Sequence, residues 1–460
     1  MTEHNRKWWI LSVAAAGVLL STIDASIVNI ALPTISEYFG TSVQTTAWVT
    51  ISYLLVITAV LLVFGRLSDI YGQKLIFGGG LLIFTIGSVL CAISASIAQL
   101  IVFRLLQGVG AAMIVSNTTA IVTNAFPPQQ RGTALGTIGA VVSVGLMSGP
   151  PLGGLIIHYL GWHYIFLVNV PVGIAAILLT IRILPEYRAD RSAVLFHPLD
   201  SLLWIAGITS LILAFRGTGN INSILANSGL YLVLCLAIMF FFFKRQKVSD
   251  APLFKIALLR NEVFLFASLA GFFSYMTMIS LTFMLPFLLE YTFGKTPLDT
   301  GRILVTIPAT TFFVSPLSGI LSDRFGQRPI ASLGTVIITL SAASLFFVDR
   351  DYSIWAIVAS LIGFGLGLGM FGSPNNSAMM GSVDIKDRGA AGGMLATVRN
   401  LGMVTGLGVI SVIYNLGLGN VRPSGGATTY LMAFKESLPF VIVFSLMALV
   451  FSALRRSIQN

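Results

Sequence analysis

Residues 65–74 read GRLSDIYGQK, and residues 319–328 read GILSDRFGQR, at an offset of 254 positions. Gly, Leu, Ser, Asp, Gly and Gln coincide, and the last position is basic in both copies. A second pair, RGTALG (131–136) and RGAAGG (388–393), follows in the same order at an offset of 257. Two motifs that recur in one order predict two halves of the same topology, arranged as a parallel repeat.

The sequence around these motifs is too apolar for a soluble protein. Of the 460 residues, 56% are hydrophobic and 10% are charged, whereas a soluble domain carries about 25% charged residues. Apolar stretches of about 20 residues, the length that crosses ~30 Å of hydrocarbon, recur along the whole chain. The composition excludes a secreted enzyme, a nucleic-acid-binding domain and a disordered scaffold, and it predicts an all-α polytopic membrane protein.

The apolar stretches predict fourteen transmembrane helices. Six helices per half account for twelve of them, so two helices are inserted between the halves. The predicted domains are an N-terminal six-helix half (1–197), an inserted helix pair (198–245) and a C-terminal six-helix half (246–460). Within these domains the helices are expected at about 8–32, 45–64, 75–96, 99–124, 133–157, 164–184, 199–215, 227–243, 262–288, 301–320, 328–348, 354–380, 390–414 and 436–454.

The basic residues predict the orientation in the membrane. One set of alternate loops, which includes both termini, holds 19 Lys and Arg residues, and the other set holds 6. The positive-inside rule therefore places both termini in the cytoplasm of a prokaryotic cell, with the chain in the plasma membrane and surrounded by lipid. The net charge of +10 is explained by this topology, so no nucleic-acid partner is expected.

Five motifs occur in a characteristic order. They are IDASIVNIALP (23–33), GRLSDIYGQK (65–74), FRLLQGVGAA (103–112), GLMSGPPLGG (145–154) and GWHYIFLVNVPVG (161–173). With these motifs and the repeat, the chain resembles transporters of the major facilitator superfamily, and within it the fourteen-helix drug:proton antiporter family. The resemblance covers nearly the whole length. His163 stands where that family usually has an Arg.

The repeated loop is a candidate cytoplasmic gate. Gly65 is expected to allow close helix approach, Gly72 a tight turn, and Asp69 an ion pair with Arg131. The pair would break and reform between inward-open and outward-open states. The alternative is a constitutive turn with a solvated charge pair. The full set of gate candidates is Gly65, Arg66, Asp69, Gly72, Lys74, Arg131, Gly319, Asp323, Gly326, Arg328 and Arg388.

Asp24 is the only carboxylate well inside a predicted helix. A charge near the bilayer centre is costly, and removal of a carboxyl group from water favours its protonated form. Asp24 is therefore the candidate proton-coupling residue. Arg104 lies at a similar depth, so an Asp24–Arg104 pair is expected to tune the proton, and the resemblance also implies that this Arg takes part in proton relay. The alternatives are a permanent structural ion pair, and an Arg104 side chain that extends to the outer surface.

Glycines line one face of the fifth predicted helix. Such a stripe of small residues allows tight helix packing, and the neighbouring prolines remove backbone donors and bend the helix. The resemblance associates this motif with antiporters. Both a bent hinge that resists leak and ordinary helix packing are open interpretations. The motif residues are Gly145, Gly149, Pro150, Gly153 and Gly154.

A set of polar residues is expected to line the substrate cavity. Thr22, Ser26 and Asn29 share one face of the first helix, from which Asp24 projects by about 160°. An ordinary interhelical hydrogen bond is the alternative role for each of them. The candidates are Thr22, Ser26, Asn29, Tyr53, Gln107, Asn117, Asn375, Asn376, Arg399 and Asn400. Glu290, at the outer end of the ninth helix, is expected at a solvated rim.

The leading functional hypothesis is a proton-coupled antiporter that exports small amphipathic or drug-like molecules by alternating access, and that works as a monomer. The proton is the coupling ion, and neither a cofactor nor a metal is expected. The two intramembrane arginines favour a second hypothesis, an exporter or facilitator of an organic anion or lipid-like molecule. A receptor or sensor that does not transport is a third. An enzyme is not expected, because the intramembrane carboxylate pair of an aspartyl protease and the Ser–His arrangement of a serine protease are both lacking.

Overall fold

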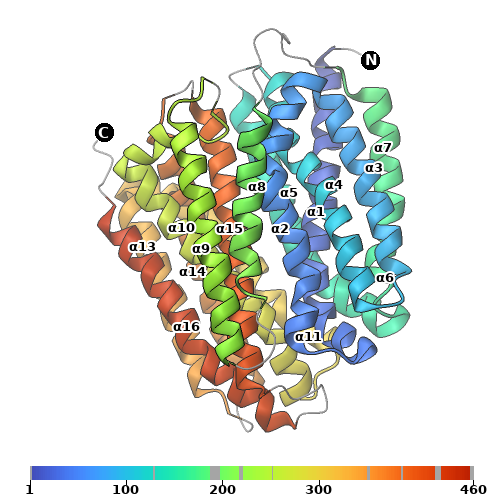
Figure 1. The fold of residues 1–460 in the computed structure, drawn as a ribbon, viewed down its shortest axis with the longest axis vertical. Coiled ribbons are helices and arrows are strands. Elements are labelled where there is room, and N and C mark those ends of the chain that lie inside the picture. The colour runs from blue at the N-terminus through green and yellow to red at the C-terminus, as the bar shows by residue number, and fades with distance from the viewer. Residues whose placement is uncertain are drawn as a thin grey trace. The chain divides into compact units, whose positions relative to one another are not determined.

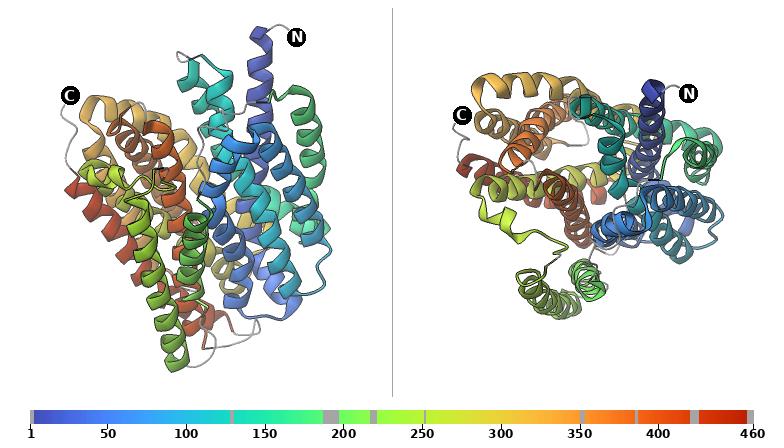
Figure 2. Two further views of the ribbon diagram at one scale, coloured as in Figure 1. Left: turned by 45° about the horizontal axis from the view of Figure 1, so that its top comes forward. Right: turned by 90° about the horizontal axis from the view of Figure 1, so that it is seen from above.

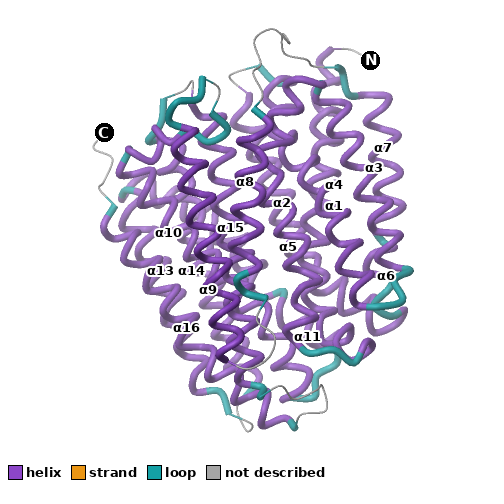
Figure 3. Tube along the Cα trace, in the orientation of Figure 1, coloured by secondary structure: helices purple, strands orange, loops and turns teal. Residues whose placement is uncertain are grey.

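The computed structural model describes residues 3–127, 130–186, 197–216, 221–250, 252–349, 353–384, 387–419 and 426–455. Every regular element in these ranges is helical (Figure 3). This is the expected result for apolar segments in lipid, because a helix satisfies all of its own backbone hydrogen bonds. The all-α prediction is confirmed.

Thirteen helices in these ranges are long and apolar enough to cross a membrane, and α8 is a shorter apolar helix. The predicted number of fourteen is thus approximately met. The elements, labelled in Figure 1, are α1 (Glu3–Phe39), α2 (Val43–Tyr71), α3 (Gln73–Ala92), α4 (Ile97–Ala125), α5 (Arg131–Leu160), α6 (Tyr164–Leu167), α7 (Asn169–Ile183), α8 (Pro198–Leu213), α9 (Ile221–Gln246), η3 (Ile256–Arg260), α10 (Glu262–Phe287), η4 (Leu288–Thr292), α11 (Pro297–Leu304), α12 (Thr306–Phe325), α13 (Gln327–Ser344), η5 (Leu345–Phe347), α14 (Ile354–Gly381), α15 (Arg388–Gly417) and α16 (Ala427–Leu454).

Several helix ends differ from the predicted ones. Helix α1 continues to Phe39, beyond the expected end at residue 32, and stops where Gly40 adopts a φ of 60°. Helix α16 begins at Ala427 rather than near residue 436. The reason is that hydropathy marks the part of a helix that crosses lipid, whereas backbone hydrogen bonding continues until a cap or a glycine stops it.

The chain packs as two compact units, which we describe separately. Unit 1 comprises residues 1–31, 48–211 and 230–253, and unit 2 comprises residues 32–47, 212–229 and 254–460. The predicted domain boundaries at 197/198 and 245/246 stay a prediction.

The inserted helices α8 and α9 form an antiparallel hairpin, visible side by side in Figure 2. In unit 1, the rings of Trp204 and Phe242 are 5.4 Å apart, and Arg245 Nε donates to Asp200 Oδ1 at 2.7 Å. Trp204 Nε1 also donates to the carbonyl oxygen of Thr58 on α2, at 3.4 Å. Ring packing and an ion pair therefore hold α8 and α9 together, and one hydrogen bond joins the part of the hairpin in unit 1 to α2.

The sequence repeat reappears as a repeat of helix packing. A Cβ atom added at Gly80 on α3 would lie 2.9 Å from the carbonyl oxygen of Gly110 on α4. In unit 2, a Cβ atom at Gly334 on α13 would lie 2.7 Å from the carbonyl oxygen of Gly367 on α14. The two pairs are related by 254 and 257 positions, the same offsets as the motifs. Each half therefore contains, at equivalent positions, a helix pair in which the backbones approach closely at glycine.

The glycine stripe of α5 packs against α1. The faces of Gly145 and Gly149 meet the side chains of Thr22 and Ser26, and a Cβ atom at Gly153 would lie 2.8 Å from Ile27. Ser26 Oγ also bonds to the carbonyl oxygen of Gly145, at 3.4 Å. The stripe therefore holds α1, the helix that carries Asp24, at close range.

We expect Gly149→Ala to lower the thermal stability of the purified protein by several degrees, because the added methyl group has no room beside Ser26. Gly139→Ala is the matched control on the same helix, since a Cβ atom there meets nothing within 4 Å. It should leave the melting temperature unchanged or raise it slightly, as alanine is the better helix former. Equal melting temperatures for the two variants would refute the packing role of the stripe.

Candidate functional site

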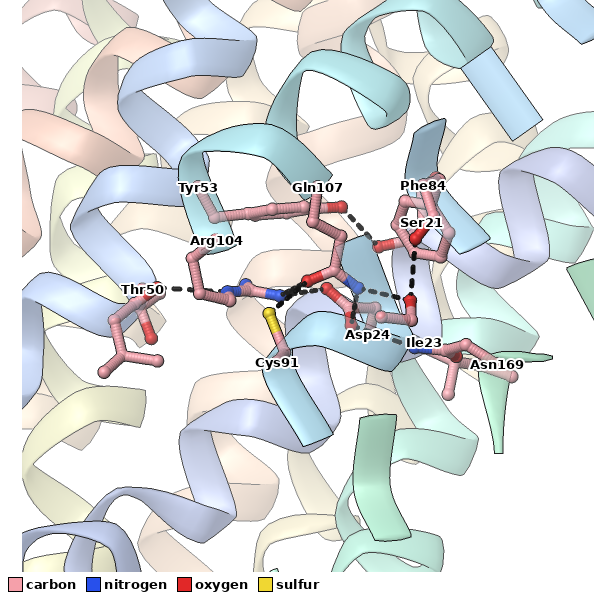
Figure 4. A network of polar contacts seen from close by, with 12 residues as sticks. Ser21, Ile23, Asp24, Thr50, Tyr53, Phe84, Cys91, Arg104, Gln107 and Asn169 are labelled. Atoms are coloured by element: carbon pink, nitrogen blue, oxygen red, sulfur yellow. Dashed lines mark hydrogen bonds and ion pairs between the residues drawn. The ribbon is translucent and has the colours of Figure 1, made fainter. Parts of the chain in front are cut away.

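Asp24 and Arg104 form a buried ion pair in unit 1. Both side chains are 0% exposed, and Arg104 Nη1 lies 2.6 Å from Asp24 Oδ2. Gln107, one helical turn along α4, accepts from the same Arg104 nitrogen at 2.6 Å and donates through Nε2 to Asp24 Oδ1 at 2.9 Å. Figure 4 shows the three side chains converging from α1 and α4. The sequence prediction of an Asp24–Arg104 interaction is correct in geometry.

Asn169 completes the carboxylate environment, and the sequence reading missed it. Its Nδ2 donates to Asp24 Oδ1 at 3.0 Å, and its side chain is 2% exposed. It is the first residue of α7, immediately after the break between α6 and α7 at Val168. The sequence carries one signal for this role: Asn169 is a polar residue within an apolar span, in the motif at 161–173.

Further partners hold Gln107 and Arg104 in place. Gln107 Nε2 also donates to Ser88 Oγ on α3 at 2.8 Å, and Cys91 Sγ lies 3.7 Å from Gln107 Oε1. Arg104 Nε donates to the carbonyl oxygen of Val49 at 3.1 Å. The guanidinium stacks over the ring of Tyr53, with its central carbon 4.0 Å from the ring centroid. Arg104 therefore points inward, and the alternative of a side chain that extends to the outer surface is wrong.

The network contains one buried guanidinium and one buried carboxyl group. As a carboxylate, Asp24 accepts three hydrogen bonds and neutralises Arg104. Loss of either charge would leave the other buried and uncompensated, which costs about 3–5 kcal/mol. Arg104 Nη2 already has no hydrogen-bond partner among the described residues. The geometry thus makes each of these two charged groups the counter-charge of the other.

Unit 2 lacks this chemistry at the corresponding positions. The offset of 254 positions aligns Ser88 with Ala342, and the offset of 257 aligns Gln107 with Phe364. The side chain of Phe364 is fully buried. At these two positions the repeat has therefore kept the glycine contacts nearby but not the polar residues of the Asp24 network.

The repeated loops make the expected tight turns. Gly72 adopts a φ of 99° between α2 and α3, and Gly326 a φ of 89° between α12 and α13. Two expectations are not met. A Cβ atom at Gly65 would meet nothing within 4 Å, so no described residue of its unit packs against that position. Arg131 Nε donates to the carbonyl oxygen of Phe126 at 3.2 Å, and no Asp69–Arg131 ion pair is found in the described part of the chain.

The other gate candidates lie at separate positions along the two repeated loops and the helices beside them. Asp69 interacts electrostatically with Arg66, one helical turn before it. Lys74 Nζ donates to the carbonyl oxygen of Ile181 at 2.7 Å. Asp323 and Arg328 are exposed, while Gly319 packs near Ser373. The side chain of Arg388 lies outside the described residues. The latch role of this loop stays a prediction.

The predicted cavity residues separate into groups. Tyr53 and Gln107 join the Asp24 network, whereas Thr22 and Ser26 lie in the α1–α5 contact. Asn29 Oδ1 accepts from Thr50 at 3.4 Å. The structure therefore places Asp24 and the Thr22–Ser26 face in contact with different helices, as the helical spacing predicts.

Three of the remaining polar candidates are buried at separate places in the fold. Asn117 Nδ2 bonds to the carbonyl oxygen of Met113 on its own helix, at 2.8 Å. Asn375 donates to the carbonyl oxygen of Ala267 and accepts from Arg455, both at 3.0 Å. Asn400 Nδ2 is buried and has no hydrogen-bond partner within the part of the chain that the structure describes.

Arg399 and Asn376 are half-buried. Arg399 on α15 interacts electrostatically with Tyr275 on α10. No carboxylate among the described residues forms an ion pair with Arg399.

Sequence comparison places the chain in a family. The Major Facilitator Superfamily profile matches residues 14–407 and 267–456. The chain belongs to the major facilitator superfamily. It is thus a transporter and a multi-pass membrane protein.

Relatives in this superfamily align over almost the full chain. It is 36% identical to the riboflavin transporter RibZ of Clostridioides difficile over 434 residues, covering 94% of both chains. It is 30% identical to a putative multidrug resistance protein, MdtD of Escherichia coli, over 427 residues, covering 91% of this chain and 89% of MdtD. A bacterial homologue of the human lysosomal transporter Spinster shares the fold, with a TM-score of 0.68 at 16% identity over 98% of this chain and 97% of that one.

Proposed function

We propose that this superfamily member is a proton-coupled antiporter that exports small amphipathic or drug-like molecules by alternating access. The observation that carries the proposal is the fully buried carboxyl group of Asp24, held by Arg104, Gln107 and Asn169. When a buried carboxyl group with one cationic partner binds a proton, it loses its negative charge, and its hydrogen bonds to that partner change. The relatives named as multidrug transporters are consistent with the substrate class.

The proposed cycle uses Asp24 as the proton carrier. A proton that enters from outside converts the carboxylate to an acid, and its attraction to Arg104 is lost. The uncompensated guanidinium then favours a second arrangement of the helices around it, in which substrate is released outward. Proton loss to the cytoplasm restores the ion pair. One proton supplies about 2.3 kcal/mol per 100 mV of membrane potential.

The proposed orientation in the membrane follows from the basic residues of the loops. The excess of basic residues in one set of loops supports cytoplasmic termini in a prokaryotic cell. In this topology the motif loops at Gly72 and Gly326 are cytoplasmic turns that open and close the inner entrance. The transporter acts as a monomer in the plasma membrane, with lipid around its apolar faces.

A second candidate is a transporter for one organic molecule, such as an anion or a flavin-like compound. Arg399 favours it, because a cation within a membrane span without a carboxylate partner among the described residues can neutralise an anionic substrate. A 36% identical relative is named as a riboflavin transporter.

The experiment is transport into inverted vesicles with the pH gradient present or collapsed. Substrates of three kinds would be compared: a lipophilic cationic dye, an amphipathic anion and riboflavin. Gradient-dependent uptake of the dye is the expected result. Uptake of riboflavin alone, unaffected when the gradient collapses, would favour the second candidate and contradict the first.

A further inference from the structure

Every hydrogen-bond partner that the structure describes for the Asp24 carboxyl group is a donor. Arg104 Nη1 donates to Oδ2, while Gln107 Nε2 and Asn169 Nδ2 both donate to Oδ1. These contacts suit a carboxylate, which only accepts hydrogen bonds. A protonated carboxyl group also carries an O–H donor, and a buried donor without an acceptor is costly. When Asp24 binds a proton, one of its partners must therefore offer an acceptor.

Arg104 and Gln107 are unsuited to this role. A guanidinium has no acceptor atom. Gln107 Oε1 already accepts from Arg104 Nη1 at 2.6 Å, and Gln107 Nε2 donates to Ser88 Oγ at 2.8 Å as well as to Asp24. If this amide turned over, its NH₂ group would face the NH₂ group of Arg104, donor against donor. The orientation of Gln107 is therefore fixed by its other contacts.

Two other titratable side chains lie next to the network, and both have other partners. Tyr53 Oη donates to the carbonyl oxygen of Ser21 at 3.3 Å, and Cys91 Sγ lies 3.7 Å from Gln107 Oε1. In the described part of the chain, neither side chain forms a hydrogen bond with Asp24. Of the side chains around the carboxyl group, Asn169 is left as the source of an acceptor.

Asn169 can supply that acceptor by turning its amide. Among the described residues, its side chain makes one hydrogen bond, the 3.0 Å bond from Nδ2 to Asp24 Oδ1. A half-turn about the last side-chain torsion exchanges Nδ2 and Oδ1, and in asparagine this torsion has a broad, roughly two-fold preference. Asn169 and Arg104 approach Asp24 from opposite sides of the view in Figure 4. The turn therefore leaves the bonds from Arg104 and Gln107 in place.

The helix is interrupted at Asn169. This residue begins α7 directly after Val168, which separates α7 from α6. Pro171, two residues later, has no N–H group to donate to the carbonyl oxygen of Leu167, so one helical hydrogen bond is missing beside Asn169. The first turn of α7 is thus a place where a local change of hydrogen bonding disrupts little regular structure.

We infer that Asn169 is a positioning residue whose amide turns when Asp24 binds a proton. It donates through Nδ2 to the carboxylate and accepts through Oδ1 from the O–H group of the acid. The inference rests on the proposed function, because it takes Asp24 as the proton carrier. The proton stays on the carboxyl group, and the charge of Asn169 does not change. One amide at the start of α7 therefore holds Asp24 of α1 in both of its charge states.

The test is the pH-difference infrared spectrum of the purified full chain. A protonated carboxyl group has a carbonyl stretching band, which lies at higher wavenumber when its O–H group has no acceptor. The band that is lost in Asp24→Asn belongs to Asp24. Asn169→Leu keeps the approximate size of the side chain but offers neither donor nor acceptor, so it should shift this band to higher wavenumber. Asn169→Ser, whose hydroxyl group can accept, should shift the band less.

Thr180→Val is the matched control on α7, because Thr180 is buried and bonds to the carbonyl oxygen of Ala176 on its own helix, at 2.7 Å. It should leave the Asp24 band where it is in the parent. An Asp24 band of unchanged wavenumber in both Asn169 variants would mean that Asn169 only donates. That result would overturn this inference and leave the proposed function standing. A spectrum without any band that depends on Asp24 would contradict the proposed function itself, and this inference with it.

Discussion

Asp24→Asn is expected to abolish the response of transport to a pH gradient while leaving substrate exchange intact. Asn keeps the size of the side chain and can accept from Arg104, but it cannot bind and release a proton. For one coupled proton, each pH unit supplies about 1.4 kcal/mol, or about a tenfold substrate concentration ratio. That ratio should fall to one in the variant. The measurement is substrate accumulation in vesicles at several imposed gradients, beside counterflow exchange without a gradient.

Ser88→Ala provides the matched control, because it removes a partner of Gln107 within the same network and changes no charge. It should accumulate substrate to nearly the parent ratio, although more slowly. If Asp24→Asn still accumulates substrate in proportion to the pH gradient, Asp24 does not carry the coupled proton and the proposed function fails.

Arg104→Gln is expected to be the most destabilising single change in unit 1. It leaves the Asp24 carboxylate buried with no cationic partner, at a cost of about 3–5 kcal/mol. Thermal unfolding of the purified protein should show this as a fall of many degrees at neutral pH.

The double variant Asp24→Asn/Arg104→Gln tests the same coupling. Removal of both charges should recover much of the lost stability, because two neutral amides can still hydrogen-bond across the α1–α4 contact. The interaction free energy from the double-mutant cycle should be about 1–3 kcal/mol. Additive effects of the two single changes would mean that the ion pair contributes nothing to stability.

The sequence was sufficient for the fold because its signals are local and strong. Apolar length predicts spanning helices, and the motif repeat at 254 and 257 positions predicts two equivalent halves. The Asp24–Arg104 pair was also predictable, because charges inside membrane spans are rare and the two lie at similar depth.

Other features depend on side-chain direction, which spacing alone does not determine. Asn169 was missed because the break at Val168, which starts α7 at that residue, leaves no mark in hydropathy. Glu290 was misjudged because the π-helical turn rotates the end of α10 and encloses one carboxyl oxygen. Thr22 and Ser26 were expected to face a cavity, but the glycines of α5 pack against them instead.

The glycine contacts between α3 and α4, and between α13 and α14, hold each helix pair at a fixed distance that spectroscopy can use as an internal reference. Backbones that touch at Gly80–Gly110 and Gly334–Gly367 cannot slide without collision, since packed interiors resist gradual deformation. Spin labels at exposed Leu75 and Val102 should therefore report one narrow distance distribution throughout the transport cycle. A label pair of this kind distinguishes true rearrangement elsewhere from changes in label behaviour, and it can calibrate any measurement of movement in this transporter.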